Sequence, residues 1–180
     1  MRNKLEVKNG KLVCYTNRGM GFEREIIESN QYYYENNIAL ITKRATPIKV
    51  IKADEEKITE AKFIDTSYLD FDGIYKGKYI AFEAKECNSD TSFPLSNIRD
   101  IQLRALANLD KFGAITFLFI NFTNINKYFI LMSKDLFEFI KENNRKSIPL
   151  SYLEKVGHKV DRTLNPPLDY LSILSKIMDF

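Results

Sequence analysis

Hydrophobic and polar positions follow two different periods along the chain. Between residues 20 and 36, apolar side chains such as Phe22, Ile26 and Tyr33 recur at helical spacing, with charged residues around the rest, which predicts an amphipathic helix. From 79 to 85 the period is two instead, which predicts a strand with two chemically different faces. The same reasoning predicts strands at 38–41, 48–51, 58–64, 69–74, 114–122 and 127–132, helices at 96–111, 133–142, 152–156 and 168–178, and a polar loop at 86–93.

Strands interleaved with helices, without an internal repeat, predict one α/β domain. Ser96 and Ser133 stand where two helices are expected to begin and suit N-caps, and Gly77-Lys78 suits a hairpin turn. The segments 48–51 and 58–64 flank an acidic turn and predict a second hairpin. That hairpin has little to bury by itself, so it either packs on another chain or projects as an arm.

Length and composition limit the class of protein without giving a function. The 180 residues are 44% hydrophobic with a net charge of +3, which suits one folded domain and is compatible with nucleic acid, although a generic lysine-rich protein fits equally well. Cys14 and Cys87 are the only cysteines and favour a reducing cytoplasm. No apolar run could span a bilayer, so we expect no membrane partner. Residues 1–17 predict a flexible basic tail or a frayed terminus.

One group of charged residues suggests a chemistry. Asp70 stands near the start of one expected strand, and Glu83 and Lys85 share a face of the next. If these strands pair, the two carboxylates converge into the kind of oxygen site that Mg²⁺ prefers, beside an ammonium group that could offset charge during phosphodiester cleavage. The alternative is a solvated strand face with a Glu–Lys ion pair. Flanking apolar residues instead place these charges in the middle of the sheet, where they need a partner or a metal.

The D-x₁₂-E-x-K spacing from Asp70 to Lys85 resembles that of the PD-(D/E)xK nucleases, and the longer string resembles the RecU family of Holliday-junction resolvases. The resemblance covers nearly the whole chain in family order, and FEAKE followed by TSFPL is its specific signature. The matching stretches are Arg18-Gly19-Met20 with Glu23, Thr46-Pro47-Ile48, 70–80, 82–86, 91–95, Gln102, Gly113, Arg145-Lys146-Ser147-Ile148 and Leu168-Asp169-Tyr170-Leu171.

This resemblance implies a restriction-endonuclease-like mixed β-sheet flanked by helices, in a single nuclease domain over residues 18–180 with a projecting hairpin stalk at about 45–64. It implies a homodimer that resolves four-way DNA junctions by paired Mg²⁺-dependent nicks during recombination and repair, with Mn²⁺ as a substitute ion. The expected partners are junction DNA, a second copy of the chain and, as a further candidate, a recombinase.

The resemblance also assigns roles to residues. Asp70, Glu83 and Gln102 match metal-site positions, Lys85 matches the transition-state stabiliser, and Glu23 matches an acidic residue of the first helix that assists catalysis. Taken alone, Gln102 would be an ordinary exposed helix residue. The basic residues expected to hold DNA phosphates, the alternative being a solvated surface, are Arg18, Lys43, Arg44, Lys49, Arg145 and Lys146.

One position departs from the family pattern. Tyr68 stands where the family has a threonine of the metal site, and Thr66 and Ser67 would replace it only in a shifted register. This departure keeps open a DNA-junction-binding or recombinase-modulating protein that does not cleave. A separate alternative is a nuclease of the same fold that cuts flaps or duplex DNA.

Overall fold

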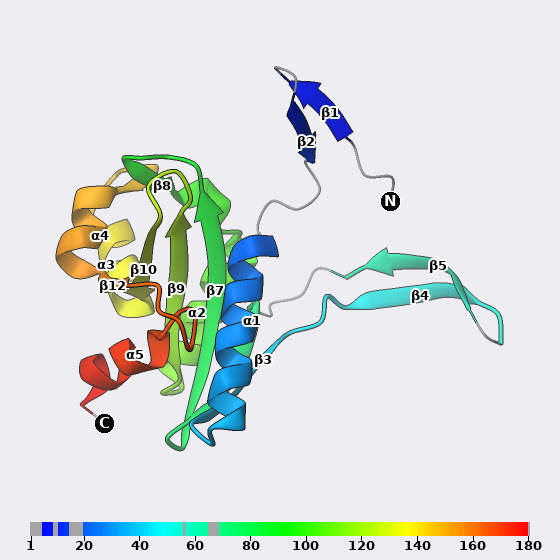
Figure 1. The fold of residues 1–180 in the computed structure, drawn as a ribbon, viewed down its shortest axis with the longest axis horizontal. Helices are drawn as coiled ribbons and strands as arrows, with labels where there is room; N and C mark the ends of the chain where they lie inside the picture. The colour runs from blue at the N-terminus through cyan, green and yellow to red at the C-terminus, as the bar shows by residue number, and fades with distance from the viewer. Residues whose placement is uncertain (1–4, 9–10, 15–19, 56, 65–68, 180) are drawn as a thin grey trace.

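A mixed six-stranded sheet forms the centre of the protein in the computed structural model, which describes residues 5–8, 11–14, 20–55, 57–64 and 69–179. The strand order is β12-β10-β9-β7-β6-β3 (Figure 1). Strands β7 and β9 run parallel, and the other neighbours run antiparallel. The strands of this sheet are β3 (Ala39–Lys43), β6 (Phe71–Tyr75), β7 (Lys78–Cys87), β9 (Ile115–Phe122), β10 (Lys127–Met132) and β12 (His158–Val160).

Helices cover both faces of the sheet, so the predicted fold class is confirmed. Helices α1 and α5 contribute to one buried cluster, and α2, α3 and α4 contribute to a second cluster on the opposite face. No helix in the described ranges is both long and apolar enough to cross a membrane. The helices are α1 (Met20–Glu35), α2 (Asp100–Lys111), α3 (Ser133–Glu142), α4 (Leu150–Val156) and α5 (Tyr170–Met178), with a 3₁₀ turn η2 (Leu95–Asn97) before α2.

Three aromatic rings fix the register of the central strands. Phe71, Phe82 and Phe117 stand opposite one another on β6, β7 and β9. The ring of Phe82 stacks on that of Phe71 at 5.0 Å and on that of Phe117 at 4.6 Å between centroids, and such pairs contribute about 0.5–1.5 kcal/mol each beyond their burial. Because Phe82 is fixed on the α1 face, the next residue, Glu83, must face α2.

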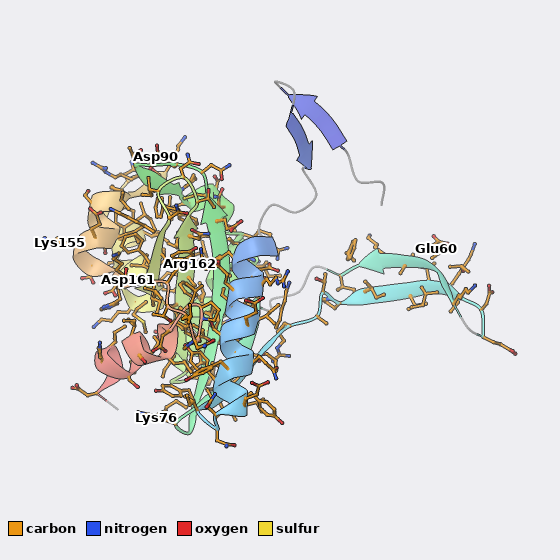
Figure 2. The ribbon with its side chains drawn as sticks, in the orientation of Figure 1. Glu60, Lys76, Asp90, Lys155, Asp161 and Arg162 are labelled. Atoms are coloured by element: carbon orange, nitrogen blue, oxygen red, sulfur yellow. The ribbon has the colours of Figure 1, made fainter. Side chains whose placement is uncertain are left out.

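The predicted second hairpin projects from the sheet (Figure 1). It comprises β4 (Ile48–Ala53) and β5 (Ile58–Phe63), which pair only with each other, and all their residues are exposed. Figure 2 shows its side chains, Glu60 among them, pointing into open space. Two smaller sheets are formed by β1 (Leu5–Lys8) with β2 (Lys11–Cys14), and by β8 (Ser92–Pro94) with β11 (Ser147–Pro149).

Several predicted boundaries were wrong, each for a local reason. Ser96 lies in the 3₁₀ turn, and α2 begins only after Arg99, which is its N-cap. Ser133 is already the first residue of α3 rather than its cap. The hairpin turn falls on Lys76 and Gly77, which both have positive φ, as a two-residue type I′ turn requires. The C-terminal helix starts two residues later than predicted, because the side chain of Asp169 accepts a hydrogen bond from the backbone N–H of Ser172 and caps it.

Candidate active site

The candidate site lies at the point where β7 extends beyond the start of β6. The last pair between these strands is Phe71 with Phe82, so the following residues of β7 have β9 on one side only. Asp70 fills the open edge. Its Oδ2 accepts a hydrogen bond from the backbone N–H of Ala84 at 3.1 Å, and its own N–H donates to Oε2 of Glu83 at 3.3 Å. The structure therefore brings the two predicted carboxylates together.

Alternation along β7 sorts its side chains as the sequence predicted. Phe82 and Ala84 belong to the buried cluster beneath α1, whereas Cys87 belongs to the cluster beneath α2. Glu83 and Lys85 share the α2 side, where they line an open hollow. The residues lining this hollow are Glu23, Asp70, Glu83, Ala84, Lys85, Glu86, Cys87, Asn88, Ser89, Pro94, Asn97, Arg99 and Gln102.

Glu83 is the most unusual residue of the site, because its carboxyl group is fully buried. Lys85 Nζ lies 2.6 Å from Glu83 Oε1. Burial, and next the negative charge of Asp70, raise the pKa of Glu83 to about 8, although Lys85 acts in the opposite direction. One ammonium group is therefore too little positive charge for two facing carboxylates, and the site favours a further cation.

Gln102 connects α2 to this carboxylate. Its Oε1 accepts a hydrogen bond from the backbone N–H of Arg99 at 2.9 Å, and its Nε2 donates to Oε1 of Glu83. Turning the amide over would put its NH₂ group against the N–H of Arg99 and its oxygen against a carboxylate oxygen, so these two partners fix the orientation. Gln102 therefore holds Glu83 through its nitrogen, while its oxygen caps the helix.

The donor set suits a hard divalent ion. Asp70 and Glu83 offer carboxylate oxygens, which Mg²⁺ prefers. In a β-strand, the N–H and C=O groups of one residue point toward the same neighbouring strand. The N–H of Ala84 donates to Asp70, so the Ala84 carbonyl points toward the same open edge of β7. In the parts of the chain that the structure describes, no three His, Cys, Asp or Glu side chains group as a metal site, and the metal role of Asp70 and Glu83 stays a prediction.

The family model "RecU: Recombination protein U" matches residues 17–176. The chain belongs to the RecU family. Similar relatives are the Holliday junction resolvase RecU of Pediococcus pentosaceus, 44% identical over 92% of this chain and 86% of the relative, and that of Lactiplantibacillus plantarum, 39% identical over 93% and 84%. A solved structure of Hjc, a Holliday junction resolvase from Archaeoglobus fulgidus, aligns with a TM-score of 0.46 and 12% identity over 78% of this chain and 95% of that one.

Two of the predicted site residues are paired with each other. Glu23, in the first turn of α1, forms an ion pair with Lys43 at the end of β3. Glu23 lies on the wall of the hollow, at the position expected for the acidic group of the first helix. Lys43 therefore offsets the charge of Glu23, and its predicted phosphate contact stays a prediction.

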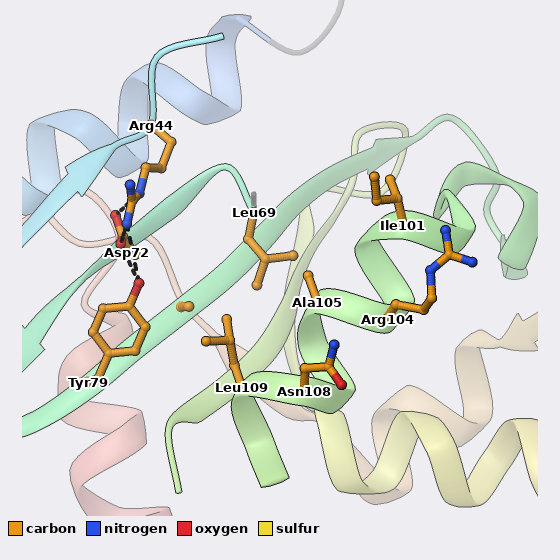
Figure 3. A pocket seen from close by; sticks show the side chains of 10 residues that line it. Arg44, Leu69, Asp72, Tyr79, Ile101, Arg104, Ala105, Asn108 and Leu109 are labelled. Carbon is orange, nitrogen blue, oxygen red and sulfur yellow. Dashed lines mark hydrogen bonds and ion pairs between the residues drawn. The ribbon is translucent and has the colours of Figure 1, made fainter. Parts of the chain in front are cut away.

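Arg44 is held by a second acidic residue of β6. Its guanidinium group binds both carboxylate oxygens of Asp72, with Nε 2.7 Å from Oδ1, and the hydroxyl of Tyr79 donates to the same carboxylate (Figure 3). Asp72 and Arg44 line a separate hollow between the sheet and α2. Asp72 thus belongs to an ion pair beside the site.

The remaining predicted DNA contacts lie in different places. Lys49 is exposed on the projecting hairpin. Arg145 and Lys146 are exposed in the loop before β11, and the carbonyl of Lys146 accepts a hydrogen bond from Leu95 N at 3.0 Å. This bond and the β8–β11 pairing hold the basic loop beside the 94–97 wall of the hollow. Arg18 and Tyr68, together with Thr66 and Ser67, lie outside the described residues.

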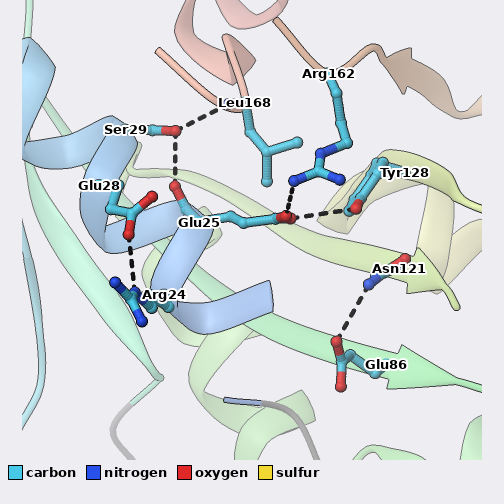
Figure 4. A network of polar contacts seen from close by, with 9 residues as sticks. All are labelled: Arg24, Glu25, Glu28, Ser29, Glu86, Asn121, Tyr128, Arg162 and Leu168. Atoms are coloured by element: carbon cyan, nitrogen blue, oxygen red, sulfur yellow. Dashed lines mark hydrogen bonds and ion pairs between the residues drawn. The ribbon is translucent and has the colours of Figure 1, made fainter. Parts of the chain in front are cut away.

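The sequence assigned no role to several residues on the hollow's wall. Arg99 adds a second basic residue to the wall, and it lies there because the start of α2 meets the end of β7. Glu86 reaches the rim, but its Oε1 accepts a hydrogen bond from Asn121 Nδ2 at 3.1 Å. Figure 4 shows this pair beside a second network, in which Glu25 binds Arg162 and Tyr128. No local motif marks these residues, because strands distant in sequence bring them together.

Proposed function

We propose that this chain is an endonuclease that resolves four-way DNA junctions by paired, Mg²⁺-dependent nicks. Membership of the RecU family, and relatives that are Holliday junction resolvases, support the substrate. The observation that carries the chemistry is the convergence of Asp70, buried Glu83 and Lys85 in one open hollow.

In this proposal, Asp70 and Glu83 hold the ion and the Ala84 carbonyl adds a third oxygen. When bound, Mg²⁺ supplies Lewis-acid polarisation of the scissile phosphate and lowers the pKa of a water molecule. Because burial raises the pKa of Glu83 to about 8, its carboxyl group would have to release a proton in order to serve as a ligand of the ion. Gln102 keeps Glu83 turned toward Asp70 and fixed to the start of α2.

Lys85 supplies the positive charge that the reaction needs next to the acidic pair. Its Nζ lies 2.6 Å from Glu83 and the side chain is 21% exposed, so it can reach both the buried carboxylate and a group bound in the hollow. We assign it the roles of orienting the attacking water and stabilising the additional negative charge on phosphate. Such a charge, pre-placed where negative charge develops, contributes about 10²–10³-fold to rate.

A homodimer fits this chemistry because one site cuts one strand, and resolution needs cuts in two opposed strands. The projecting hairpin presents Lys49 together with exposed Ile51 and Phe63, which suits contact with DNA or with a second copy of the chain. The dimer, a recombinase partner and a cytoplasmic location stay predictions. Analytical ultracentrifugation of the full chain tests the first of them.

The deciding experiment incubates the protein with a synthetic mobile four-way junction, with Mg²⁺, with Mn²⁺ or with EDTA, and resolves the products on a denaturing gel. We expect symmetric nicks in two opposed strands with either ion and none in EDTA. Glu83→Gln should abolish nicking and Lys85→Ala should lower its rate by about 10²–10³-fold. Gel shifts of the junction in EDTA should stay unchanged, because neither change removes an exposed DNA contact.

Other outcomes would identify the alternatives. Junction binding without nicking under both ions would favour a non-cleaving junction-binding protein. Equal cutting of linear duplex or flap substrates would favour a different nuclease of this fold. Full nicking by Glu83→Gln or Lys85→Ala would place the active site elsewhere in the protein.

A further inference from the structure

Arg44 occupies the junction between the sheet and the projecting hairpin. The last pair of the β3–β6 ladder is Lys43 with Phe71, and the backbone N–H of Arg44 extends this ladder by one bond, donating to the Asp70 carbonyl at 2.8 Å. Immediately after Arg44, the chain leaves the sheet toward β4. The main chain of Asp70 is thus held by the residue at the root of the hairpin.

The side chain of Arg44 binds Asp72, which lies two residues after Asp70, the residue that the backbone of Arg44 contacts. Figure 3 shows the guanidinium group lying over Asp72 with the Tyr79 hydroxyl on the other side of the carboxylate. The Arg44–Asp72 contact is bidentate, and Asp72 is only 8% exposed. A carboxylate this deeply buried needs its partners, and a bidentate Arg–carboxylate pair fixes both distance and orientation.

These contacts enclose Asp70. Arg44 binds its carbonyl through the backbone and binds residue 72 through the side chain. On the other side, Asp70 N–H meets the carboxylate of Glu83, and Oδ2 meets the N–H of Ala84. The peptide that carries Asp70 is therefore fixed from β3 as well as from β7. Segment 65–68, which precedes it, lies outside the described residues.

We infer that Arg44 is a positioning residue that fixes Asp70 for metal binding, through its ion pair with Asp72, and not a DNA phosphate contact. This inference rests on the proposed function in one respect only, that Asp70 is a metal ligand. It gives the ion pair a role that the family resemblance does not assign, and it ties the root of the hairpin to the metal site.

Metal affinity separates this role from a purely electrostatic one. Removing a positive charge close to a cation site should strengthen cation binding by Coulomb's law. Loss of positioning should weaken it, by about 10-fold on the scale of residues that orient metal ligands. The two effects have opposite signs, so the direction of the change already decides between them.

The experiment measures Mn²⁺ affinity by the paramagnetic resonance of free Mn²⁺, and junction affinity by gel shift in EDTA over a range of salt. Arg44→Gln should bind Mn²⁺ about 10-fold more weakly, with an unchanged junction affinity and salt slope. Arg44→Lys should not restore Mn²⁺ affinity, because one ammonium cannot make two parallel bonds. The matched control is Arg24→Gln, which removes an Arg–Glu pair that is exposed on α1 and should change neither quantity.

A double variant tests whether Arg44 acts on Asp70 through Asp72. If Arg44 acts through Asp72, Arg44→Gln with Asp72→Asn should be no worse than the more affected single variant, whereas independent roles would multiply the losses. Should Arg44→Gln fail to fold, Tyr79→Phe provides a milder test, with an expected loss of about 3-fold in Mn²⁺ affinity. Tyr79→Phe binding Mn²⁺ as wild type would then count against the inference.

Two results would overturn the inference. The first is unchanged or tighter Mn²⁺ binding by Arg44→Gln, and the second is weaker junction binding in EDTA with a salt slope reduced by about one and rescued by Arg44→Lys. A different result would refute the proposed function. A wild-type chain that binds Mn²⁺ but never nicks a junction refutes the nuclease, while a weakened Mn²⁺ site in Arg44→Gln would still support the positioning role.

Discussion

Replacing Glu83 by Gln should abolish activity and yet stabilise the metal-free protein at alkaline pH. The carboxyl group is fully buried, and burial raises its pKa from an ordinary 4.5 to about 8. The folded state therefore holds this proton more tightly than the unfolded state does. Stability that is present below pH 4.5 is lost as the pH rises toward 8, because folding must then either keep a proton or bury a charge.

The size of the effect follows from the same two values. Each pH unit between 4.5 and about 8 corresponds to about 1.4 kcal/mol of unfolding free energy. The full loss approaches about 5 kcal/mol, which is large beside the about 5–15 kcal/mol that stabilises a typical domain. Glutamine has no proton to lose in this range, so the variant should keep the stability that wild type loses.

Urea unfolding in EDTA, at half-unit steps from pH 4.5 to 8.5, measures the difference between the two proteins. We expect wild type and Glu83→Gln to be nearly equal at the acid end and to diverge progressively up to about pH 8. Glu142→Gln, a change at an exposed position of α3, is the matched control and should follow wild type. Parallel curves for wild type and Glu83→Gln would refute the reasoning that burial of this carboxylate opposes folding.

Three further predictions concern the surroundings of the site. Lys85→Ala should lower the nicking rate by about 10²–10³-fold at unchanged junction affinity, measured in single-turnover assays, and an unaltered rate would exclude its assigned role. Arg145→Gln with Lys146→Gln should reduce the salt slope of junction binding by about two, and an unchanged slope would leave the loop as a solvated surface. Gly73→Ala should cost more than about 3 kcal/mol, because its Cβ would lie 2.0 Å from the Leu40 carbonyl oxygen. A wild-type thermal midpoint would contradict this.

Long, strongly periodic segments were predictable from the sequence. Strand β10 has the predicted boundaries, Lys127–Met132, and helix α3 ends at the predicted Glu142, because their apolar residues repeat over enough positions to define a period. The three-residue strands β8, β11 and β12 were missed, because a pattern that short has no measurable period. The predicted start of the helix at Ser96 was wrong. Serine suits an N-cap, but the backbone first makes a separate 3₁₀ turn there.

The candidate site, like the fold, was predictable from the sequence only in part. Period-two alternation was sufficient to place Glu83 and Lys85 on one face, and pairing of adjacent strands was sufficient to bring Asp70 to them. No local rule indicates that Arg44, separated from Asp72 by the whole hairpin, would bind that carboxylate rather than remain available for phosphate. Contacts between side chains depend on distances between strands, and one sequence carries those distances only implicitly.

The position of Glu83 joins the fold to the proposed reaction. Stacking of Phe82 between its neighbours fixes the strand, and strand geometry then forces the next side chain into the interior beneath α2. A carboxylate placed there opposes folding above pH 4.5, whereas a bound divalent ion adds stability that grows with its concentration. Mg²⁺ should therefore raise the thermal midpoint more at pH 8 than at pH 6, and it should do so in wild type but much less in Glu83→Gln. In the proposed reaction, the destabilisation of the metal-free fold and the expected metal affinity are thus two consequences of one buried charge.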